Sequence, residues 1–92
     1  MDIRVLRYFV TIAQELNMSR AAELLNVSQP ALSRQIADLE DELGVKLFRR
    51  EHRHLALTQE GHYLLGRAQQ IVGLVNKTTY HLQKARCDQW HD

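Results

Sequence analysis

Four side chains with the chemistry to contact DNA open the outward side of one predicted helix. They are Gln29, Pro30, Ser33 and Arg34. Amide, hydroxyl and guanidinium groups reach base edges and phosphates when a helix enters a major groove. Residues three and four positions apart share a helix face, so the group forms one surface. Since most polar helix faces simply face water, this surface does not decide the function by itself.

A cationic cluster follows this helix, and a group of acids lies just before the cluster. The cations are Lys46, Arg49, Arg50 and Arg53, and the acids are Asp38, Glu40, Asp41 and Glu42. The acids gather at the far end of the helix, so its start is free of negative charge and can approach phosphates. The arginines also fit a solvated strand edge that resists aggregation. Together with the polar face, the pattern favours phosphate contact.

Two helices joined by a tight corner must position the first surface. Ser19 is expected to cap a short helix, which Asn26 ends because it tolerates the left-handed conformation. Ser28 is expected to cap the next helix, with Pro30 in the first turn. The buried residues of this helix recur at helical spacing: Leu32, Ile36, Leu39 and Leu43. Residues 19–44 are therefore predicted to form a helix-turn-helix.

A helix with two apolar stripes is predicted before this motif, from about Asp2 to about Leu16. One stripe holds Leu6, Phe9, Val10 and Ala13, and the other holds Val5, Tyr8 and Ile12. Two apolar faces require two neighbours. We expect the helix-turn-helix to cover one and the start of a later long helix to cover the other.

The hydrophobic period changes after Gly44, a natural helix-stopping residue. The segment LFRREHRHLALT indicates two short strands, 47–50 and 55–57, joined by a polar tip. This hairpin is predicted to form a wing. Its histidines, His52 and His54, could serve with His62 as metal ligands, but no cysteine or carboxylate cluster with zinc spacing is nearby. Solvated wing histidines are the preferred interpretation.

A long helix is predicted from a Thr58 cap to about Arg86, without proline. At 1.5 Å per residue it is on the order of 40 Å long, more than a small domain needs, so the surplus should meet another chain. Its apolar residues follow a seam-like spacing of four and three: Leu64, Ala68, Ile71, Val75 and, further on, Leu82. Gly66 and Gly73 either allow close helix approach or tolerate exposure. Residues 88–92 are expected to be a frayed tail.

Length and composition indicate one globular domain. The chain has 92 residues, 45% hydrophobic and 25% charged, with a net charge of +1. No apolar run is long enough for a membrane span, and the amphipathic start is unlike a secretory signal. We expect a cytoplasmic, nucleoid-associated protein, and its single cysteine, Cys87, fits a reducing compartment. No phosphate loop, nucleophile motif or metal set is found, so we expect no enzyme, cofactor or small-molecule site.

In order along the chain, four segments resemble the N-terminal DNA-binding module of LysR-type bacterial transcriptional regulators. They are LRYFV at 6–10, SRAAELLNVSQPALSRQI at 19–36, LEDELGVKLFRR at 39–50, and Leu57, Thr58 and Gly61. The resemblance implies a mainly α fold. A winged helix-turn-helix of three helices and a two-stranded wing would span 1–57, followed by a linker dimerisation helix over 58–87. It also implies DNA contacts by Ser28, Gln29, Pro30, Ser33, Arg34, Arg50 and Arg53, with Ser28 near a phosphate.

Two departures from the family pattern stand out. The wing often carries a glycine near its tip, whereas this chain has Glu51-His52-Arg53-His54, and Glu51 opposes a nearby phosphate. The large effector-binding domain of family members is not encoded within these 92 residues.

We therefore predict a sequence-specific double-stranded DNA-binding domain of a bacterial transcriptional regulator. It would be a homodimer through the linker helix, or a tetramer within a longer chain. Two alternatives remain at this point. One is a winged-helix module that buries the Gln29-Ser33-Arg34 face against a protein. The other is a dimerisation-dominant inhibitor of longer relatives.

Overall fold

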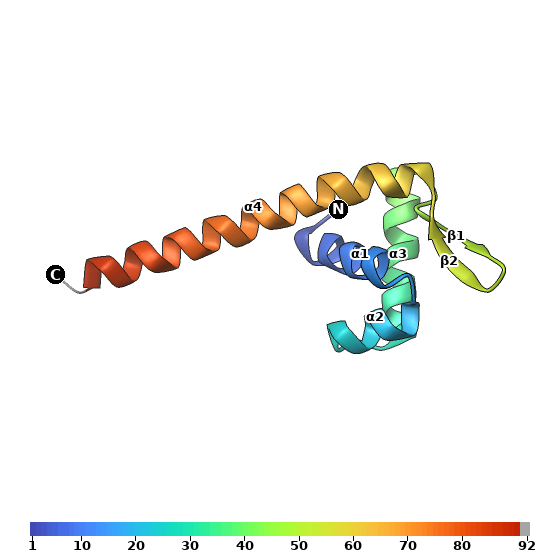
Figure 1. Ribbon diagram of the computed structural model, residues 1–92, viewed down its shortest axis with the longest axis horizontal. Helices are drawn as coiled ribbons and strands as arrows, with labels where there is room; N and C mark the ends of the chain where they lie inside the picture. Colours follow the sequence, from blue (N-terminus) through green and yellow to red (C-terminus); the bar gives the residue numbers. More distant parts are fainter. Residues whose placement is uncertain (91–92) are drawn as a thin grey trace.

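The computed structural model describes the backbone of residues 1–90 and the side chains of residues 1–86. Its elements are α1 (Ile3–Glu15), α2 (Met18–Leu25), α3 (Gln29–Leu43), β1 (Phe48–Glu51), β2 (His54–Leu57) and α4 (Gln59–Trp90). Three short helices pack into a body, a hairpin extends from one end, and α4 crosses the body and projects beyond it (Figure 1). The predicted mainly α winged helix-turn-helix with a long following helix is confirmed.

Local caps fix the helix-turn-helix as the sequence predicts. Asn26 ends α2 in the left-handed conformation, with φ of 58°. The Ser28 side chain accepts a hydrogen bond from the Ala31 N–H at 3.2 Å, and Pro30 lies in the first turn of α3. Gly44 ends α3 with φ of 72°. These caps leave only three residues, Asn26 to Ser28, between α2 and α3.

The predicted Ser19 cap is wrong. Helix α2 begins at Met18, and its N-cap is Asn17, whose Oδ1 accepts a hydrogen bond from the Arg20 N–H at 2.9 Å. Asn17 and Ser19 are both good capping residues. The earlier start places Met18 inside the helix, where it packs against the core. Apolar packing thus selects between two caps that local propensity cannot distinguish.

The core lies between the three helices of the body and the first half of α4. Helix α1 packs against α2, α3 and α4, so the prediction that both its apolar stripes are covered is confirmed. The buried residues are Val5, Leu6, Phe9, Ile12, Ala13, Ala21, Ala22, Leu32, Ile36, Leu39, Leu47, Leu57, Leu64 and Ala68. Arg7 Nη2 donates to Asn76 Oδ1 at 2.7 Å and ties α1 to α4.

The wing is an antiparallel pair with Phe48 opposite Leu57 and Glu51 opposite His54. The predicted strands are therefore right to within one residue. The Phe48 ring packs on Phe9 with centroids 5.3 Å apart. Glu40 Oε2 accepts hydrogen bonds from the N–H groups of Leu47 and Phe48, at 2.7 and 3.3 Å. One carboxylate thus joins α3 to the root of the wing.

The start of α4 is fastened to the same root. The Thr58 N–H donates to the Leu47 carbonyl at 3.0 Å, and Thr58 Oγ1 donates to the Lys46 carbonyl at 2.6 Å. Thr58 Oγ1 also accepts from the Gly61 N–H at 2.9 Å, which confirms it as the cap. A Cβ atom at Gly61 would lie 2.2 Å from the Leu47 carbonyl oxygen. Only glycine permits this approach between helix and wing.

Helix α4 ends at Trp90, beyond the predicted end near Arg86. Of the expected frayed tail, residues 88–90 belong to this helix, and residues 91–92 lie outside the described part. Every described side chain from Asn76 to Arg86 is exposed. Across the residues described, no helix is long and apolar enough to cross a membrane.

Candidate nucleic-acid interface

The first two turns of α3 present the predicted polar face to solvent. Leu32, Ile36 and Leu39 hold the opposite side of the helix in the core. The outward residues are Ser28, Gln29, Pro30 and Arg34, all exposed, and Ser33, which is half-buried. The structure therefore brings the five predicted α3 residues onto one surface. Nothing on that surface carries negative charge until Asp38.

The wing lies beside this face, and a shallow recess of about 250 Å³ separates them. Ser33 and Ala37 of α3 form one wall, and Lys46, Arg49 and Arg50 contribute from the wing side. Arg49 belongs to the cationic cluster whose pattern favours phosphate contact, but it is not among the DNA contacts that the family resemblance implies. Its place in the cationic cluster was the available signal, but only the fold shows that it borders the α3 surface.

A second recess of about 190 Å³ continues the surface toward the start of α2. Its lining includes Asn17, Ser19, Gln29, Arg50 and Arg53. Arg50 borders both recesses and so connects the α3 face with the wing. Residues far apart in the sequence thereby form one polar surface built from α2, α3 and the wing.

The cations of this surface differ in their partners. Lys46 Nζ lies 3.9 Å from Glu40 Oε1, and Arg49 Nε lies 2.5 Å from Glu51 Oε1. Within residues 1–86, no acidic partner is found for Arg34, Arg50 or Arg53. These three guanidinium groups can therefore bind phosphate or a base edge without breaking an ion pair.

The wing tip adopts an uncommon turn. His52 and Arg53 connect the two strands, and both have positive φ, 46° and 68°. Left-handed conformation at both central residues is the pattern of a type I′ hairpin turn, which usually contains asparagine or glycine. The tight two-residue turn therefore forms even though His52 and Arg53 stand where the family often has a glycine. It puts the Arg53 side chain, rather than a bare backbone, at the tip.

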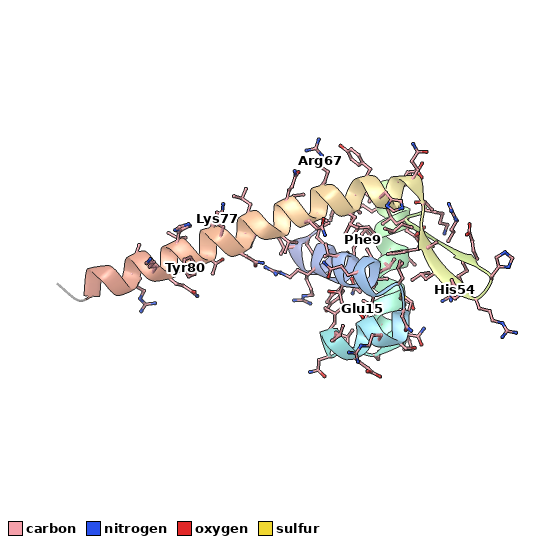
Figure 2. All side chains as sticks on the ribbon, viewed as in Figure 1. Phe9, Glu15, His54, Arg67, Lys77 and Tyr80 are labelled. Atoms are coloured by element: carbon pink, nitrogen blue, oxygen red, sulfur yellow. The ribbon has the colours of Figure 1, made fainter. Side chains whose placement is uncertain are left out.

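The wing histidines form no metal cluster in the structure. In the part of the chain that the structure describes, no three His, Cys, Asp or Glu side chains converge as metal ligands would. Figure 2 shows His54 on the wing. His52, His54 and His62 are all exposed.

The five predicted dimerisation residues of α4 fall into two groups. Leu64 and Ala68 are buried in the core of their own chain, Ala68 completely. Packing within the chain thus explains the first half of the seam, and these two side chains are not available to a partner. Val75 is half-buried, whereas Ile71 and Leu82 are exposed, at 38% and 67%.

Exposed apolar residues that the seam did not include continue the same side of α4. Leu74 is 65% exposed and Tyr63 is 67% exposed, and both lie within one helix face with Ile71 and Leu82. A groove of about 700 Å³ borders this face, and its apolar walls include Leu43 and Val45 from the end of α3. Of the exposed apolar residues on this face, the sequence singled out Ile71 and Leu82 but not Tyr63 or Leu74.

Comparison with known proteins shows which family has this architecture. The model of the lysR family of bacterial regulatory helix-turn-helix proteins matches residues 3–62, from α1 into the start of α4. The chain belongs to the LysR family. It has 55% identity over 73 residues to the transcriptional regulator BsdA of Bacillus subtilis (strain 168), covering 78% of this chain and 25% of BsdA.

Two solved LysR-family structures superpose on nearly the whole chain. The CbnR DNA-binding domain in its DNA complex is 41% identical with a TM-score of 0.85, over 94% of this chain and 99% of that one. The BenM DNA-binding domain with catB site 1 DNA is 38% identical with a TM-score of 0.87, over 91% and 93%. The chain spans about a quarter of the length of the curated relatives BsdA and the cat1 operon activator of Acinetobacter lwoffii.

Proposed function

We propose that this chain binds double-stranded DNA sequence specifically, as the DNA-binding domain of a bacterial transcriptional regulator of the LysR family. Helix α3 enters the major groove, and the wing contacts the backbone or the minor groove. The observation that carries the proposal is the surface shared by α3 and the wing, whose two recesses are lined by residues that include Gln29, Ser33, Arg50 and Arg53. Arg34 is exposed on the same helix, and within residues 1–86 no acidic partner is found for Arg34, Arg50 or Arg53. The DNA complexes of the CbnR and BenM domains support it.

The proposed DNA contacts differ between α3 and the wing. Gln29, Ser33 and Arg34 are assigned to base edges with Pro30 beside them, and Ser28 to a phosphate at the start of α3. Arg50 and Arg53 are assigned to backbone phosphates. Since bacterial DNA lies in the cytoplasm, the protein would act there, on the nucleoid.

The comparisons do not favour a protein-interaction module or an enzyme. A protein-interaction module would cover the α3 face with another protein, whereas the similar CbnR and BenM domains were solved with DNA. The relatives are transcriptional regulators rather than enzymes.

A binding assay at controlled salt tests the proposal. Duplexes enriched from a random pool by binding to the protein are compared with scrambled duplexes of the same composition. We expect the enriched duplex to bind at least 10³-fold more tightly, the usual lower range for specific binding. Equal affinity for both duplexes would remove the specificity claim, and no binding at low salt would remove the DNA claim.

We further propose that the domain forms a homodimer through α4. The helix leaves the body after Asn76, and its apolar face, with Ile71, Leu74 and Leu82, stays exposed within residues 1–86. A second copy with the same face can cover it reciprocally, as a two-fold interface requires. Two copies would place two α3 helices on one duplex, so half-site spacing follows from the dimer. A tetramer would need contacts outside this face.

Replacing Leu74 and Leu82 together by glutamine is expected to shift the dimer toward monomer. Both substitutions are present in both protomers, so four apolar contacts of roughly 1–2 kcal/mol each are lost, and the dissociation constant should rise about a thousandfold or more. Sedimentation equilibrium measures this directly. Tyr80→Gln is the matched control, because Tyr80 is 59% exposed but lies on the opposite side of α4. A dimer unaffected by the leucine changes, or equally weakened by Tyr80→Gln, would contradict the assigned face.

A further inference from the structure

The wing contains a single acidic residue, and one of the wing's own cations binds it. Between Phe48 and Leu57 the only carboxylate is Glu51. Its Oε1 accepts a hydrogen bond from Arg49 Nε at 2.5 Å, and the two side chains are each about half exposed. They stand two positions apart on β1, so they project from the same face of the strand. The pair cancels one positive charge of the wing.

This pair lies at the border of the proposed DNA surface. Arg49 lines the recess between α3 and the wing, together with Ser33 and Arg50. An arginine in this position would ordinarily gain a phosphate and release a counter-ion from the duplex. Here the Arg49 guanidinium is already paired with the Glu51 carboxylate. Contact with DNA would require Arg49 to exchange a carboxylate for a phosphate and would leave Glu51 unpaired beside a polyanion.

We infer that Glu51 is an internal counter-ion that withholds Arg49 from the DNA backbone and so lowers the sequence-independent affinity of the domain. The inference rests on the proposed contact between wing and DNA. The contrast with Arg50 and Arg53 supports it, since these neighbours have no acidic partner within residues 1–86. Because a chromosome offers a vast excess of non-specific sites, weaker backbone binding leaves more protein free to find its operator.

Glu51→Gln tests the inference, since it keeps the side-chain size and removes the charge. At about 0.1 M salt we expect affinity for a scrambled duplex to rise roughly fivefold to tenfold, and the log–log salt slope to steepen by about one. Asp41→Asn is the matched control, because it removes the same charge from an exposed residue near the far end of α3. Equal gains in both variants would overturn the inference, since net charge alone would then explain them.

The role of Arg49 is tested by repeating Glu51→Gln in an Arg49→Gln background. If Glu51 acts through Arg49, the gain is smaller there than in the native background. A gain of the same size would overturn the counter-ion assignment and indicate direct repulsion of phosphate.

Arg53→Ala separates failure of this inference from failure of the proposed wing contact. If Arg53→Ala weakens binding to the scrambled duplex while Glu51→Gln leaves it unchanged, only the counter-ion inference is overturned. If Arg53→Ala also leaves binding unchanged, the wing does not contact DNA, and the inference falls with that contact.

Discussion

Gly61→Ala is expected to destabilise the domain by roughly 1–3 kcal/mol or more, because the added methyl group overlaps backbone. The new Cβ would lie 2.2 Å from the Leu47 carbonyl oxygen and 2.9 Å from Leu57 Cδ2. That carbonyl already accepts the Thr58 N–H, so it cannot retreat without breaking the joint between α4 and the wing. Thermal unfolding should show a fall in midpoint of roughly 5–20 °C for a domain of this size.

Gly66→Ala is the matched control, one turn further along α4. A Cβ there has no atom within 4 Å, so the substitution should stabilise the helix by about 1 kcal/mol. Both variants are compared at one protein concentration, because a dimer's midpoint depends on it. If Gly61→Ala unfolded at the same temperature as the unsubstituted protein, the tight joint would have to be more yielding than its geometry indicates.

Arg34→Ala is expected to weaken binding to the specific duplex by roughly 1–3 kcal/mol while changing scrambled-duplex binding little. The reason is its place on the α3 face, where a guanidinium can bind a guanine edge through two hydrogen bonds. Fluorescence anisotropy with both duplexes at several salt concentrations measures the two affinities. The specificity ratio should fall by the same factor as the specific affinity.

Arg53→Ala should act differently, because we assign the tip of the wing to the backbone or the minor groove. We expect both duplexes to bind more weakly, and the log–log salt slope to flatten by about one. Lys77→Ala controls for lost charge, since Lys77 lies on the exposed half of α4 (Figure 2). The reverse pattern, with Arg53 setting specificity and Arg34 the salt slope, would show that the two roles are misassigned.

Features of the fold that depend on neighbouring residues were predictable from the sequence. Ser28, Asn26 and Gly44 act through their own backbone conformation or a hydrogen bond three residues away. Their residue types therefore predict the corner and the ends of α3. The Asn17 cap was missed for the same local reason, because Ser19 satisfies the same rule and only packing of Met18 decides between them.

Features that depend on distant contacts were not predictable. The spacing of Leu64 and Ala68 indicates an apolar helix face, but period alone does not say whether the same chain or a second copy covers it. Glu40 reads as one of four acids at a helix end, yet its carboxylate binds two N–H groups of the wing root. The polar α3 residues could be found from the sequence, whereas the place of Arg49 beside Ser33 required the fold.

The Glu40 carboxylate and the Thr58 hydrogen bonds have a mechanical consequence. They connect α3, the wing and the root of α4 through three consecutive residues, Lys46 to Phe48. With so short a connection, α3 cannot rotate independently of α4. Each α4 would therefore move as one rigid body with the α3 and wing of its own chain. In a dimer, a change in the angle between the two α4 helices would rotate the two α3 helices relative to each other by the same angle. It would therefore alter which half-site spacing fits.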